Sequence, residues 1–374
     1  MLNQTKKIFI VGIKGVAMTN LALILKKMGK KVSGSDVKEE FITDSLLQKN
    51  MIPFQEGFDP RDLPKETSLV IYSSGHQGQN NPQVLAAKKR KIKTTTQAEF
   101  LAELLKQFKT KIAVCGCHGK TTTSSLLAYA LLKLGASPSY MVGSSSFNSY
   151  PGGDYKANDY FVVEADEYGV NPPYDITPKF SLLKPDSILC TNIDFDHPDV
   201  YKNIEEVKFA FLKFFQKFRV DSKKNYHLDT IVSRWSKSPL IFCADNKSLM
   251  SLARKLPRAS YLTYGYNSSS DLKIINIGIN ENGSSFMLQL KNQRHSGLSR
   301  IDSVAIQLGP RMTIKLFGEK NISNAAGVIL TLLQVGFSAE KIKEAIKDFK
   351  GAKRRFEQAY VKNDTFLFDD YAHH

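Results

Sequence analysis

The amino-acid sequence predicts an α/β protein whose strands form parallel, doubly wound sheets. Short runs of apolar and β-branched residues alternate with segments of helical periodicity, which is typical of strand–helix–strand units. Two of these runs are followed by a glycine-containing turn and then by a helix. The chain has 374 residues, which is enough for two or three domains.

The first hundred residues contain the first set of alternating elements. Strands are expected at residues 7–11, 31–35 and 68–73, and helices at residues 17–28 and 96–107. This alternation predicts a Rossmann-like N-terminal domain over residues 1–107.

A second strand–turn–helix unit opens the next domain, which we assign to residues 108–358. Its strands are expected at residues 111–115, 160–163 and 187–191, and its helices at residues 120–135, 321–333 and 339–349. Residues 271–307 alternate in polarity between turns rich in Asn, Gly and Ser, so they predict an antiparallel patch. Residues 359–374 are expected to begin a third, Rossmann-like domain, most of which is missing from this chain.

The composition narrows the classes of function. The chain carries 52 Lys+Arg against 36 Asp+Glu, a formal net charge of +16. The lysines are scattered and accompany no RNA-binding or zinc-finger motif, so no nucleic-acid partner is expected. Every apolar stretch is broken by a charge or a glycine well before the roughly 18 residues of a membrane span. The N-terminus runs straight into a strand without a signal peptide, so we expect a cytoplasmic protein.

Four cysteines are too few for a disulfide scaffold in a chain of this length. Cys115 and Cys117 form a C-x-C pair inside the glycine turn of the second unit. Only His118 stands near them as a further metal ligand, so we interpret both cysteines as small residues that fit a tight loop.

The second glycine turn has the context of a phosphate-binding loop. The sequence GCHGKTTT covers residues 116–123 and lies between a strand and a helix. Glycines allow backbone N–H groups to approach phosphates, and the helix N-terminus adds positive potential. Lys120 would neutralise the phosphates of ATP and the Thr121 hydroxyl would bind Mg²⁺. The strict spacing of the Walker motif is not met, because Val114 stands where its first glycine would be, and a purely structural turn is the alternative.

Acidic residues follow two other expected strands. Glu164, Asp166 and Glu167 come directly after the strand at 160–163, and His197 stands among aspartates after the strand at 187–191. In open α/β sheets, ligands bind at the carboxyl ends of strands. Together with the phosphate loop, these strand ends predict one Mg–ATP site, although either cluster alone is often a solvated loop.

The first glycine turn carries a degraded dinucleotide motif. Gly12 and Gly15 are present, but Lys14 and Ala17 stand where glycines are expected. Asp36 lies 24 residues after Gly12, at the end of the second strand, where an acidic residue could hold a ribose. Any nucleotide could use this turn, including the cofactor of a dehydrogenase. A dehydrogenase is disfavoured because the phosphate loop would have no role in it.

The order of these motifs resembles that of the Mur ligase family, the ATP-dependent amide ligases of peptidoglycan precursor synthesis. The segments on which this resemblance rests are, in chain order, VGIKGVAM, VSGSD, CGCHGKTTT, VEADEY, TNIDFDHPD, GEKNISNAAG, GAKRRFE and FDDYAHH. The first segment, VGIKGVAM, and the last, which contains DDYAHH, are most similar to the branch of the family that extends UDP-N-acetylmuramate. VSGSD, SSGHQGQNNPQV and AEFLAELLK favour members that add L-alanine, whereas EGFDP, EADEY and PKFSLLKPD resemble members that recycle a murein tripeptide, L-Ala-γ-D-Glu-diaminopimelate. We favour L-alanine.

The resemblance implies a role for each motif. The cofactors would be ATP and Mg²⁺. The catalytic residues would be Lys120, Glu164, His197 and Arg355. The ATP-binding residues would be Gly116, Cys117, His118, Gly119, Lys120, Thr121, Thr122, Asn321, Asn324, Arg355 and Asp370, with the two asparagines near adenine, Arg355 near the γ-phosphate and Asp370 near the ribose. Thr121 would bind one Mg²⁺, and Glu164 and His197 a second. The UDP-sugar would contact Gly12, Gly15, Asp36, Ser73 and Ser74.

Two residues depart from the family pattern. Cys117 replaces the usual Thr of the loop, and Lys320 stands where a His commonly precedes the first Asn. The implied reaction activates a carboxylate as an acyl phosphate, which an amine then attacks. A nucleotide-binding module without ligase activity is the alternative of another class, but binding alone does not need a second metal site.

Overall fold

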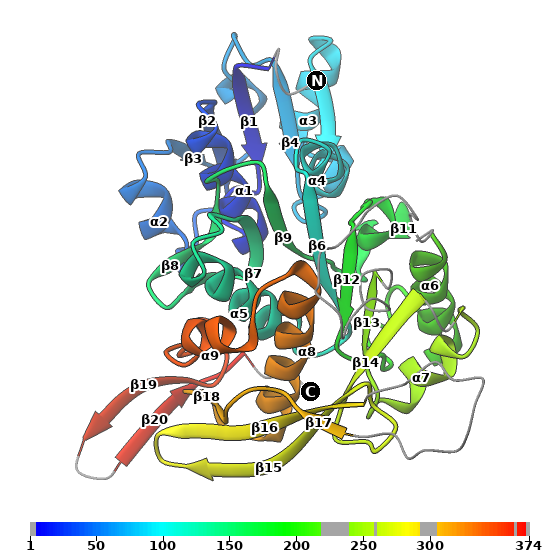
Figure 1. The fold of residues 1–374 in the computed structure, drawn as a ribbon. Helices are drawn as coiled ribbons and strands as arrows, with labels where there is room; N and C mark the ends of the chain where they lie inside the picture. The colour runs from blue at the N-terminus through cyan, green and yellow to red at the C-terminus, as the bar shows by residue number, and fades with distance from the viewer. Residues whose placement is uncertain (1–4, 218–238, 258–259, 292–304, 363–364, 372–374) are drawn as a thin grey trace.

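The computed structural model describes residues 5–217, 239–257, 260–291, 305–362 and 365–371. Its first sheet lies in the upper part of Figure 1 and has five parallel strands in the order β3-β2-β1-β4-β5. The strands are β1 (Lys7–Val11), β2 (Lys31–Asp36), β3 (Phe54–Glu56), β4 (Leu69–Tyr72) and β5 (Lys93–Thr96). The helices are α1 (Val16–Lys27), α2 (Asp44–Lys49), α3 (Pro82–Lys89) and α4 (Gln97–Leu105), with short 3-10 turns at Pro60–Asp62 (η1) and Gly78–Asn80 (η2).

The second sheet has eleven strands, and its central part is parallel. The main path runs β17-β16-β15-β14-β13-β12-β6-β9-β7-β8, and β18 pairs with β16. The parallel strands are β6 (Thr110–Cys115), β7 (Ser139–Phe147), β9 (Tyr160–Glu164), β12 (Ser187–Cys190), β13 (Leu240–Cys243), β14 (Tyr261–Gly265) and the start of β15 (Leu272–Asn280). The antiparallel additions are β8 (Tyr150–Asp154), β16 (Gly283–Lys291), β17 (Ala305–Gln307) and β18 (Met312–Ile314).

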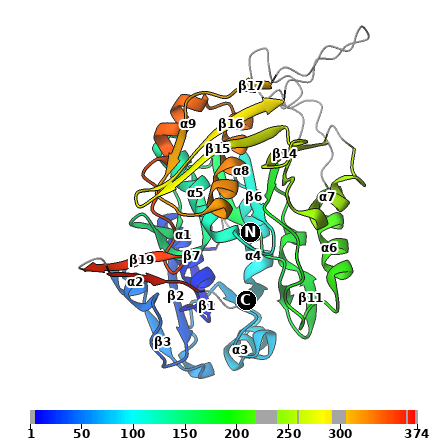
Figure 2. The ribbon, with the colours of Figure 1, turned by 90° about the horizontal axis from the view of Figure 1, so that it is seen from below.

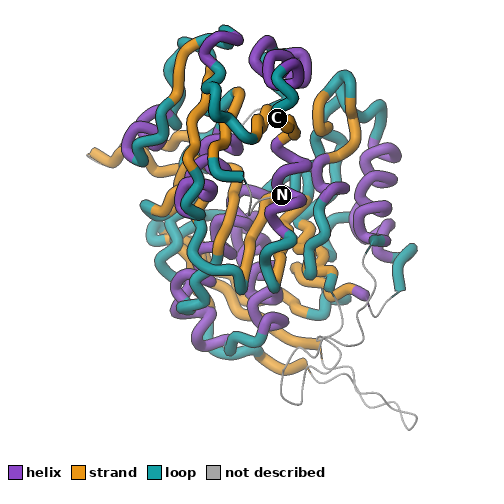
Figure 3. The backbone as a smooth tube through the Cα atoms, turned by 90° about the horizontal axis from the view of Figure 1, so that it is seen from above, coloured by secondary structure: helices purple, strands orange, loops and turns teal. Residues whose placement is uncertain are grey.

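Helices cover both faces of the central strands (Figures 2 and 3). On one face, α5 (Lys120–Lys133) packs against α8 (Glu319–Val335) and α9 (Ala339–Ile346). On the other side lie α6 (Ile204–Gln216) and α7 (Lys247–Ala253). Two small hairpins complete the fold: β10 (Gly169–Asn171) with β11 (Asp175–Pro178), and β19 (Glu357–Lys362) with β20 (Thr365–Asp369). A 3-10 turn, η3 (Lys179–Leu182), follows β11.

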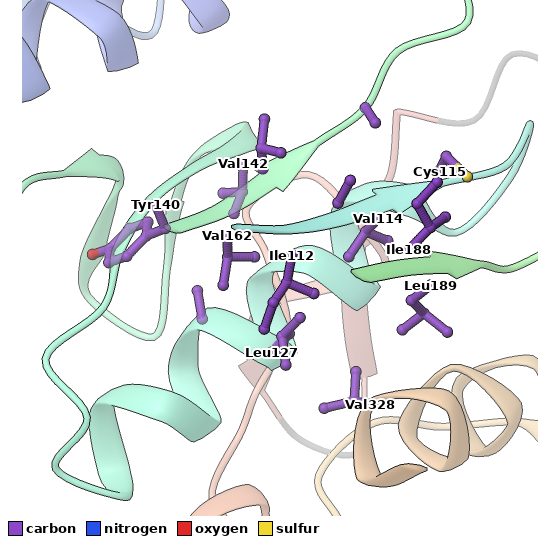
Figure 4. Packing of buried hydrophobic residues seen from close by; sticks show 14 of the residues in the cluster. Ile112, Val114, Cys115, Leu127, Tyr140, Val142, Val162, Ile188, Leu189 and Val328 are labelled. Carbon is purple, nitrogen blue, oxygen red and sulfur yellow. The ribbon is translucent and has the colours of Figure 1, made fainter. Parts of the chain in front are cut away.

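The core beneath the phosphate loop is dry and closely packed (Figure 4). Ile112 and Val114 of β6 and Val162 of β9 are fully buried against Leu127 of α5 and Val328 of α8. A helix that is apolar on nearly all sides must be enclosed, and α5 lies between the sheet and α8. This packing fixes the helix whose N-terminus carries the loop.

The expected α/β class with parallel sheets is confirmed. The expected helices and strands of both sheets are present within a few residues, and residues 271–291 form the predicted antiparallel pair β15–β16. Part of that patch, residues 292–304, lies outside the described residues. The domain boundary expected near residue 107 falls in the connection between α4 and β6. The second boundary, expected near residue 358, falls inside strand β19. Within the described part of the chain, no helix is both long and apolar enough to cross a membrane.

The two sheets are joined through α1, which packs on the β7–β8 hairpin. The Asn20 amide is fully buried and donates to the carbonyl oxygens of Val142 and Ser144, at 2.9 Å each. Lys27 forms an ion pair with the buried Asp154 at 2.6 Å. These contacts hold the first sheet at a fixed place above the carboxyl ends of the central strands.

Candidate functional site

The phosphate loop connects β6 to α5 and needs its two glycines. Gly116 has a φ of +128°, and a Cβ there would lie 2.2 Å from Thr191 Oγ1. Gly119 has a φ of +80° and caps the N-terminus of α5. The exposed His118 donates its backbone N–H to Asn192 Oδ1 at 2.9 Å, and the Thr191 hydroxyl donates to the His118 carbonyl at 2.6 Å. The end of β12 thus fixes a loop that leads into the N-terminus of α5, where the backbone N–H groups of the first helical turn suit an anion.

Cys117 is part of the loop's own structure. Its thiol donates to the Asp194 carbonyl at 3.1 Å and accepts the Asp194 N–H at 3.2 Å. Burial raises the pKa of the Cys117 thiol to about 12. All four cysteines are buried and free, so the described site holds no thiolate ligand. Thr122, in the first turn of α5, is half-buried.

Lys120 is a buried cation tied to one carboxylate. Its Nζ lies 2.7 Å from Glu167 Oε1 and donates to the Cys117 carbonyl at 3.2 Å. Desolvation lowers the pKa of Lys120, but the charges of Glu167, Asp166 and Glu164 outweigh it and raise the pKa above its usual value. Lys120 is therefore charged and ready to neutralise a phosphate.

Glu164, at the end of β9, points at the first turn of α5. The Thr121 hydroxyl donates to its Oε1 at 3.1 Å, and Oε2 accepts the Ser124 hydroxyl at 3.2 Å and the Gly143 N–H at 2.7 Å. Arg355 Nη2 donates to Thr121 Oγ1 at 3.4 Å. Burial raises the pKa of Glu164. Thr121 thus links two other predicted residues, Glu164 and Arg355, by hydrogen bonds although all three are far apart in the sequence.

His197 belongs to a second group. Within the described chain, Asp166, Glu167 and His197 offer ligand atoms that all lie within 4.8 Å of one another. His197 Nε2 lies 3.5 Å from Glu167 Oε1, and its hydrogen bond to Glu167 raises the pKa of His197. Glu167 is 1% exposed and its Oε2 has no hydrogen-bond partner among the described residues. The structure gives Glu164 and His197 different partners, so the pair expected on one Mg²⁺ falls into two adjacent groups.

Of the two residues expected near adenine, one lines a large cavity and the other lies beside the phosphate loop. Asn321 lines a cavity of about 600 Å³ together with Phe317 and Gly351, and its amide donates to the Phe317 carbonyl at 2.9 Å. Asn324 lies one turn further along α8, with Oδ1 3.0 Å from the place of a Cβ on Gly119. The cavity and the phosphate loop therefore lie on either side of the first turns of α8.

The C-terminal described residues return to the same region. The ring of Tyr371 faces both Arg354 and Arg355, whose guanidinium carbons lie 5.0 and 5.5 Å from its centroid. Asp370 is exposed beside Tyr371. The structure thus leaves the Asp370 carboxylate open to solvent, next to the arginine that contacts the first turn of α5.

The turn after β1 differs from the expectation for Asp36. Gly12 has a φ of +81°, and a Cβ there would lie 2.5 Å from Ser73 Oγ. Asp36 is 1% exposed, accepts the Lys14 N–H at 2.6 Å and pairs with His76 Nε2 at 3.1 Å. The carboxylate expected to hold a ribose is therefore used inside the turn. The exposed edge belongs instead to His76, which sequence reasoning missed.

Lys14 explains why the motif is degraded at this turn. Its side chain is buried and its Nζ donates to the carbonyls of Val37 and Glu39 at 3.0 and 2.9 Å. It thus ties the β1 turn to the chain after β2 from inside the domain. Gly15 caps α1 with an ordinary φ of −58°, and Ser74 is half-buried in the facing turn.

A cavity of about 210 Å³ lies between the two sheets, next to Glu164. Most of its wall is apolar, and its polar side chains are Gln97, Glu164, Asp166 and Lys179. The lining from the first domain is Val16, Ala17, Gln97, Ala98 and Leu101, and that from the second is Met141, Val142, Gly143, Glu164, Asp166, Lys179, Phe180 and Leu183. The cavity therefore lies between the start of α1, which follows the Gly12–Gly15 turn, and Glu164, which contacts the first turn of α5.

Comparison with protein families agrees with this geometry. Residues 7–109 match the catalytic domain model of the Mur ligase family, and residues 114–332 match the Mur ligase middle domain. The chain belongs to the Mur ligase family. The DDYAHH motif that helped to predict it ends at residues 372–374, outside the described chain.

Two curated relatives of this Mur ligase carry the same name. UDP-N-acetylmuramate–L-alanine ligase of Acetivibrio thermocellus is 32% identical over 375 aligned residues, covering 100% of this chain and 71% of the relative. The protein of the same name from Lactobacillus gasseri is 33% identical, covering 100% of this chain and 74% of the relative.

Solved structures share the fold. The UDP-N-acetylmuramate:L-alanyl-gamma-D-glutamyl-meso-diaminopimelate ligase from Neisseria meningitides has a TM-score of 0.75 at 24% identity, covering 94% of this chain and 100% of that one. UDP-N-acetylmuramate-alanine ligase from Thermotoga maritima also has a TM-score of 0.75 at 24% identity, covering 98% of this chain and 74% of that one.

Proposed function

We propose that this Mur ligase joins L-alanine to UDP-N-acetylmuramate with hydrolysis of ATP to ADP and phosphate. The observation that carries the proposal is the convergence of Lys120, Thr121, Glu164 and Arg355 at the carboxyl ends of β6 and β9. The name shared by the curated relatives supports L-alanine as the amine.

The substrates can be placed from the contacts. The phosphates of ATP fit the loop at the N-terminus of α5, and adenine fits the cavity beside Asn321 and Asn324. UDP fits the turn formed by Gly12 and Ser73, and the muramyl group fits the cavity between the sheets, which ends at Glu164. Each substrate then reaches the same strand ends.

The donor atoms also fit Mg²⁺. Thr121 and Glu164 offer a hydroxyl and a carboxylate, and the adjacent Asp166, Glu167 and His197 offer two carboxylates and an imidazole. The unpartnered Glu167 Oε2 is a buried acceptor suited to a cation. Bound there, Mg²⁺ would offset the charge of the phosphates.

The reaction begins with two anions that repel each other. The lactyl carboxylate of UDP-N-acetylmuramate attacks the γ-phosphorus of ATP, the bond to the β–γ bridging oxygen breaks, and ADP leaves. Lys120 and Arg355 lower the barrier because they place positive charge where negative charge builds up. The amine of L-alanine then attacks the acyl carbon, loses a proton, and the tetrahedral intermediate expels phosphate to leave the amide.

The acyl phosphate must be shielded from water. Val16, Leu101 and Phe180 form apolar walls of the interdomain cavity at its end next to Glu164. A muramyl group seated there would displace water from the carboxylate, which also strengthens the charge interactions around it.

Of two alternatives, a ligase that adds a tripeptide has specific support. The EADEY and PKFSLLKPD segments resemble enzymes that add a tripeptide, and in this structure they flank the β10–β11 hairpin, on which Tyr174 and Ile176 are exposed. The other alternative is a nucleotide-binding module. The contacts of Lys120, Thr121 and Arg355 disfavour a module, since a stable nucleotide complex does not need them all.

The test is ATP-dependent phosphate release by the full-length protein with UDP-N-acetylmuramate and one amine at a time. Turnover with L-alanine supports the proposal, and turnover only with L-Ala-γ-D-Glu-diaminopimelate moves the assignment to the tripeptide ligase. A folded protein that binds ATP but turns over neither amine would support the binding module.

A further inference from the structure

One oxygen of the buried Glu167, Oε2, is the acceptor offered to Mg²⁺ above, whereas the mechanism leaves its other oxygen, Oε1, without a role. Its side chain is 1% exposed, and one oxygen, Oε1, lies 2.7 Å from Lys120 Nζ and 3.5 Å from His197 Nε2. It is thus the only described residue that contacts both of these predicted catalytic groups through one atom.

The turn that carries Glu167 is held on several sides. The Tyr201 hydroxyl donates to the Glu167 carbonyl at 2.6 Å, and Tyr201 is itself buried. Phe180 donates its N–H to the Asp166 carbonyl, and Ala165 donates its N–H to the Val114 carbonyl of β6, at 2.9 and 2.8 Å. The backbone on both sides of Glu167 is therefore fixed relative to the strand that leads into the phosphate loop.

The geometry at Lys120 leaves one direction open. An ammonium has three N–H donors. Two of them are directed to Glu167 Oε1 and the Cys117 carbonyl, so the third has a defined direction. We infer that Glu167 is a positioning residue, which aims the Lys120 ammonium at the γ-phosphate and holds His197 beside it. This inference rests on the proposed function.

Direct attraction of the ATP phosphates cannot be the role of Glu167. A carboxylate next to the phosphate loop repels phosphate, so in the absence of Mg²⁺ its charge weakens nucleotide binding. Its buried place between Lys120 and His197 is explained if the orientation of these two side chains matters more than affinity for the phosphates. The expected signature of its loss is therefore a fall in kcat without a loss of affinity for ATP measured in the absence of Mg²⁺.

The test compares Glu167→Gln with wild type in full-length protein. Glutamine keeps the shape and removes the charge that aligns Lys120. We expect kcat for phosphate release to fall by about 100-fold, as for a misplaced catalytic group, while the Kd for ATP measured by calorimetry in the absence of Mg²⁺ stays equal or becomes tighter. Asp159→Asn, which breaks the exposed ion pair with Lys109, is the matched control and should leave both quantities unchanged.

The outcomes are distinct. An inactive wild type would refute the proposed function and, with it, the inference that rests on that function. With an active wild type, a kcat within threefold of it, or a loss confined to ATP affinity, would overturn the inference. If Glu167→Gln fails to fold in thermal unfolding, Tyr201→Phe decides, because it loosens the same turn: a lowered kcat with unchanged ATP Kd supports the inference, and an unchanged kcat overturns it.

Discussion

The thiol of Cys117 is part of the hydrogen bonding that holds the phosphate loop. The family pattern has a threonine at this place, and the thiol makes the two backbone contacts with Asp194 that a hydroxyl could also make. Burial keeps the thiol neutral, with a pKa raised to about 12. The substitution is therefore compatible with ATP binding, which depends on the loop backbone.

The cysteine gives a pH-dependent prediction. In the unfolded chain the Cys117 thiol has a pKa of about 8.5. Above that pH the unfolded state binds fewer protons than the folded state, so the free energy of unfolding falls. Relative to Cys117→Thr, wild type should lose about 2 kcal/mol of unfolding free energy between pH 7 and pH 10. Denaturant unfolding at both pH values measures this difference. A difference that is independent of pH would contradict a buried neutral thiol.

At the same scale, the sequence predicted residues whose role depends on neighbouring positions better than residues whose role depends on contacts with distant positions. Lys120 and Thr121 could be predicted because the strand–glycine–helix context lies within one stretch of chain. Glu167 could not be separated from Glu164 and Asp166, because its role depends on contacts with residues 47 and 30 positions away. The enclosure of Asp36 by Lys14 and His76 could not be predicted, because no pattern in the sequence indicated these contacts.

At the scale of elements, the pairing of β7 with β9 places a backbone N–H on the carboxylate of Glu164. Both strands are parallel neighbours, and Gly143 lies two residues after Met141, the last residue of β7 that pairs with β9. Hydrophobic periodicity predicted β1, β2, β4, β6, β9 and β12 and the helices α1, α4, α5, α8 and α9. The β7–β8 hairpin was missed because its serines and glycines lack a clear apolar alternation. Elements missed as well are β3, β5, β13, β14, α2, α3, α6 and α7.

Gly143→Ala tests this pairing. A Cβ at this residue would lie 2.4 Å from Glu164 Oε1, so the carboxylate must leave Thr121. We expect kcat to fall at least tenfold, with about 1–3 kcal/mol of lost stability from the strained contact. The measurements are phosphate release and thermal unfolding.

Gly29→Ala is the matched control. Gly29 ends the first helix with a φ of +79°, and a Cβ there would meet nothing within 4 Å. It should cost stability through backbone strain and leave kcat unchanged. Equal effects of both variants on kcat would show that the Glu164 position is unimportant.

At the scale of the whole molecule, α1 of the first domain is fixed on the β7–β8 hairpin of the second. Asn20 fills the contact, and a Cβ on Gly152 would lie 2.6 Å from its amide nitrogen. The sequence predicted two sheets but not this joint, because a buried Asn in an amphipathic helix has no distinguishing pattern. The joint keeps the UDP turn, the interdomain cavity and the phosphate loop in one arrangement.

Asn20→Ala should weaken that joint. Two buried carbonyls, of Val142 and Ser144, lose their donor, at a cost of about 2 kcal/mol. We expect one cooperative unfolding transition, shifted as a whole, in calorimetry. Asn50→Ala removes a bond within a single helical turn, to Leu46, and should have a smaller effect. Two separate transitions, of which only one shifts, would contradict a single cooperative unit.

The central claim is that the site transfers the γ-phosphoryl group of ATP to a carboxylate. The most direct measurement uses UDP-N-acetylmuramate labelled with ¹⁸O in both oxygens of the lactyl carboxylate, together with ATP and L-alanine. Transfer through an acyl phosphate predicts one ¹⁸O atom in each phosphate released, because the carboxylate oxygen leaves with phosphorus when the amine attacks. Phosphate released without ¹⁸O would show that water attacks ATP directly, and would contradict the account.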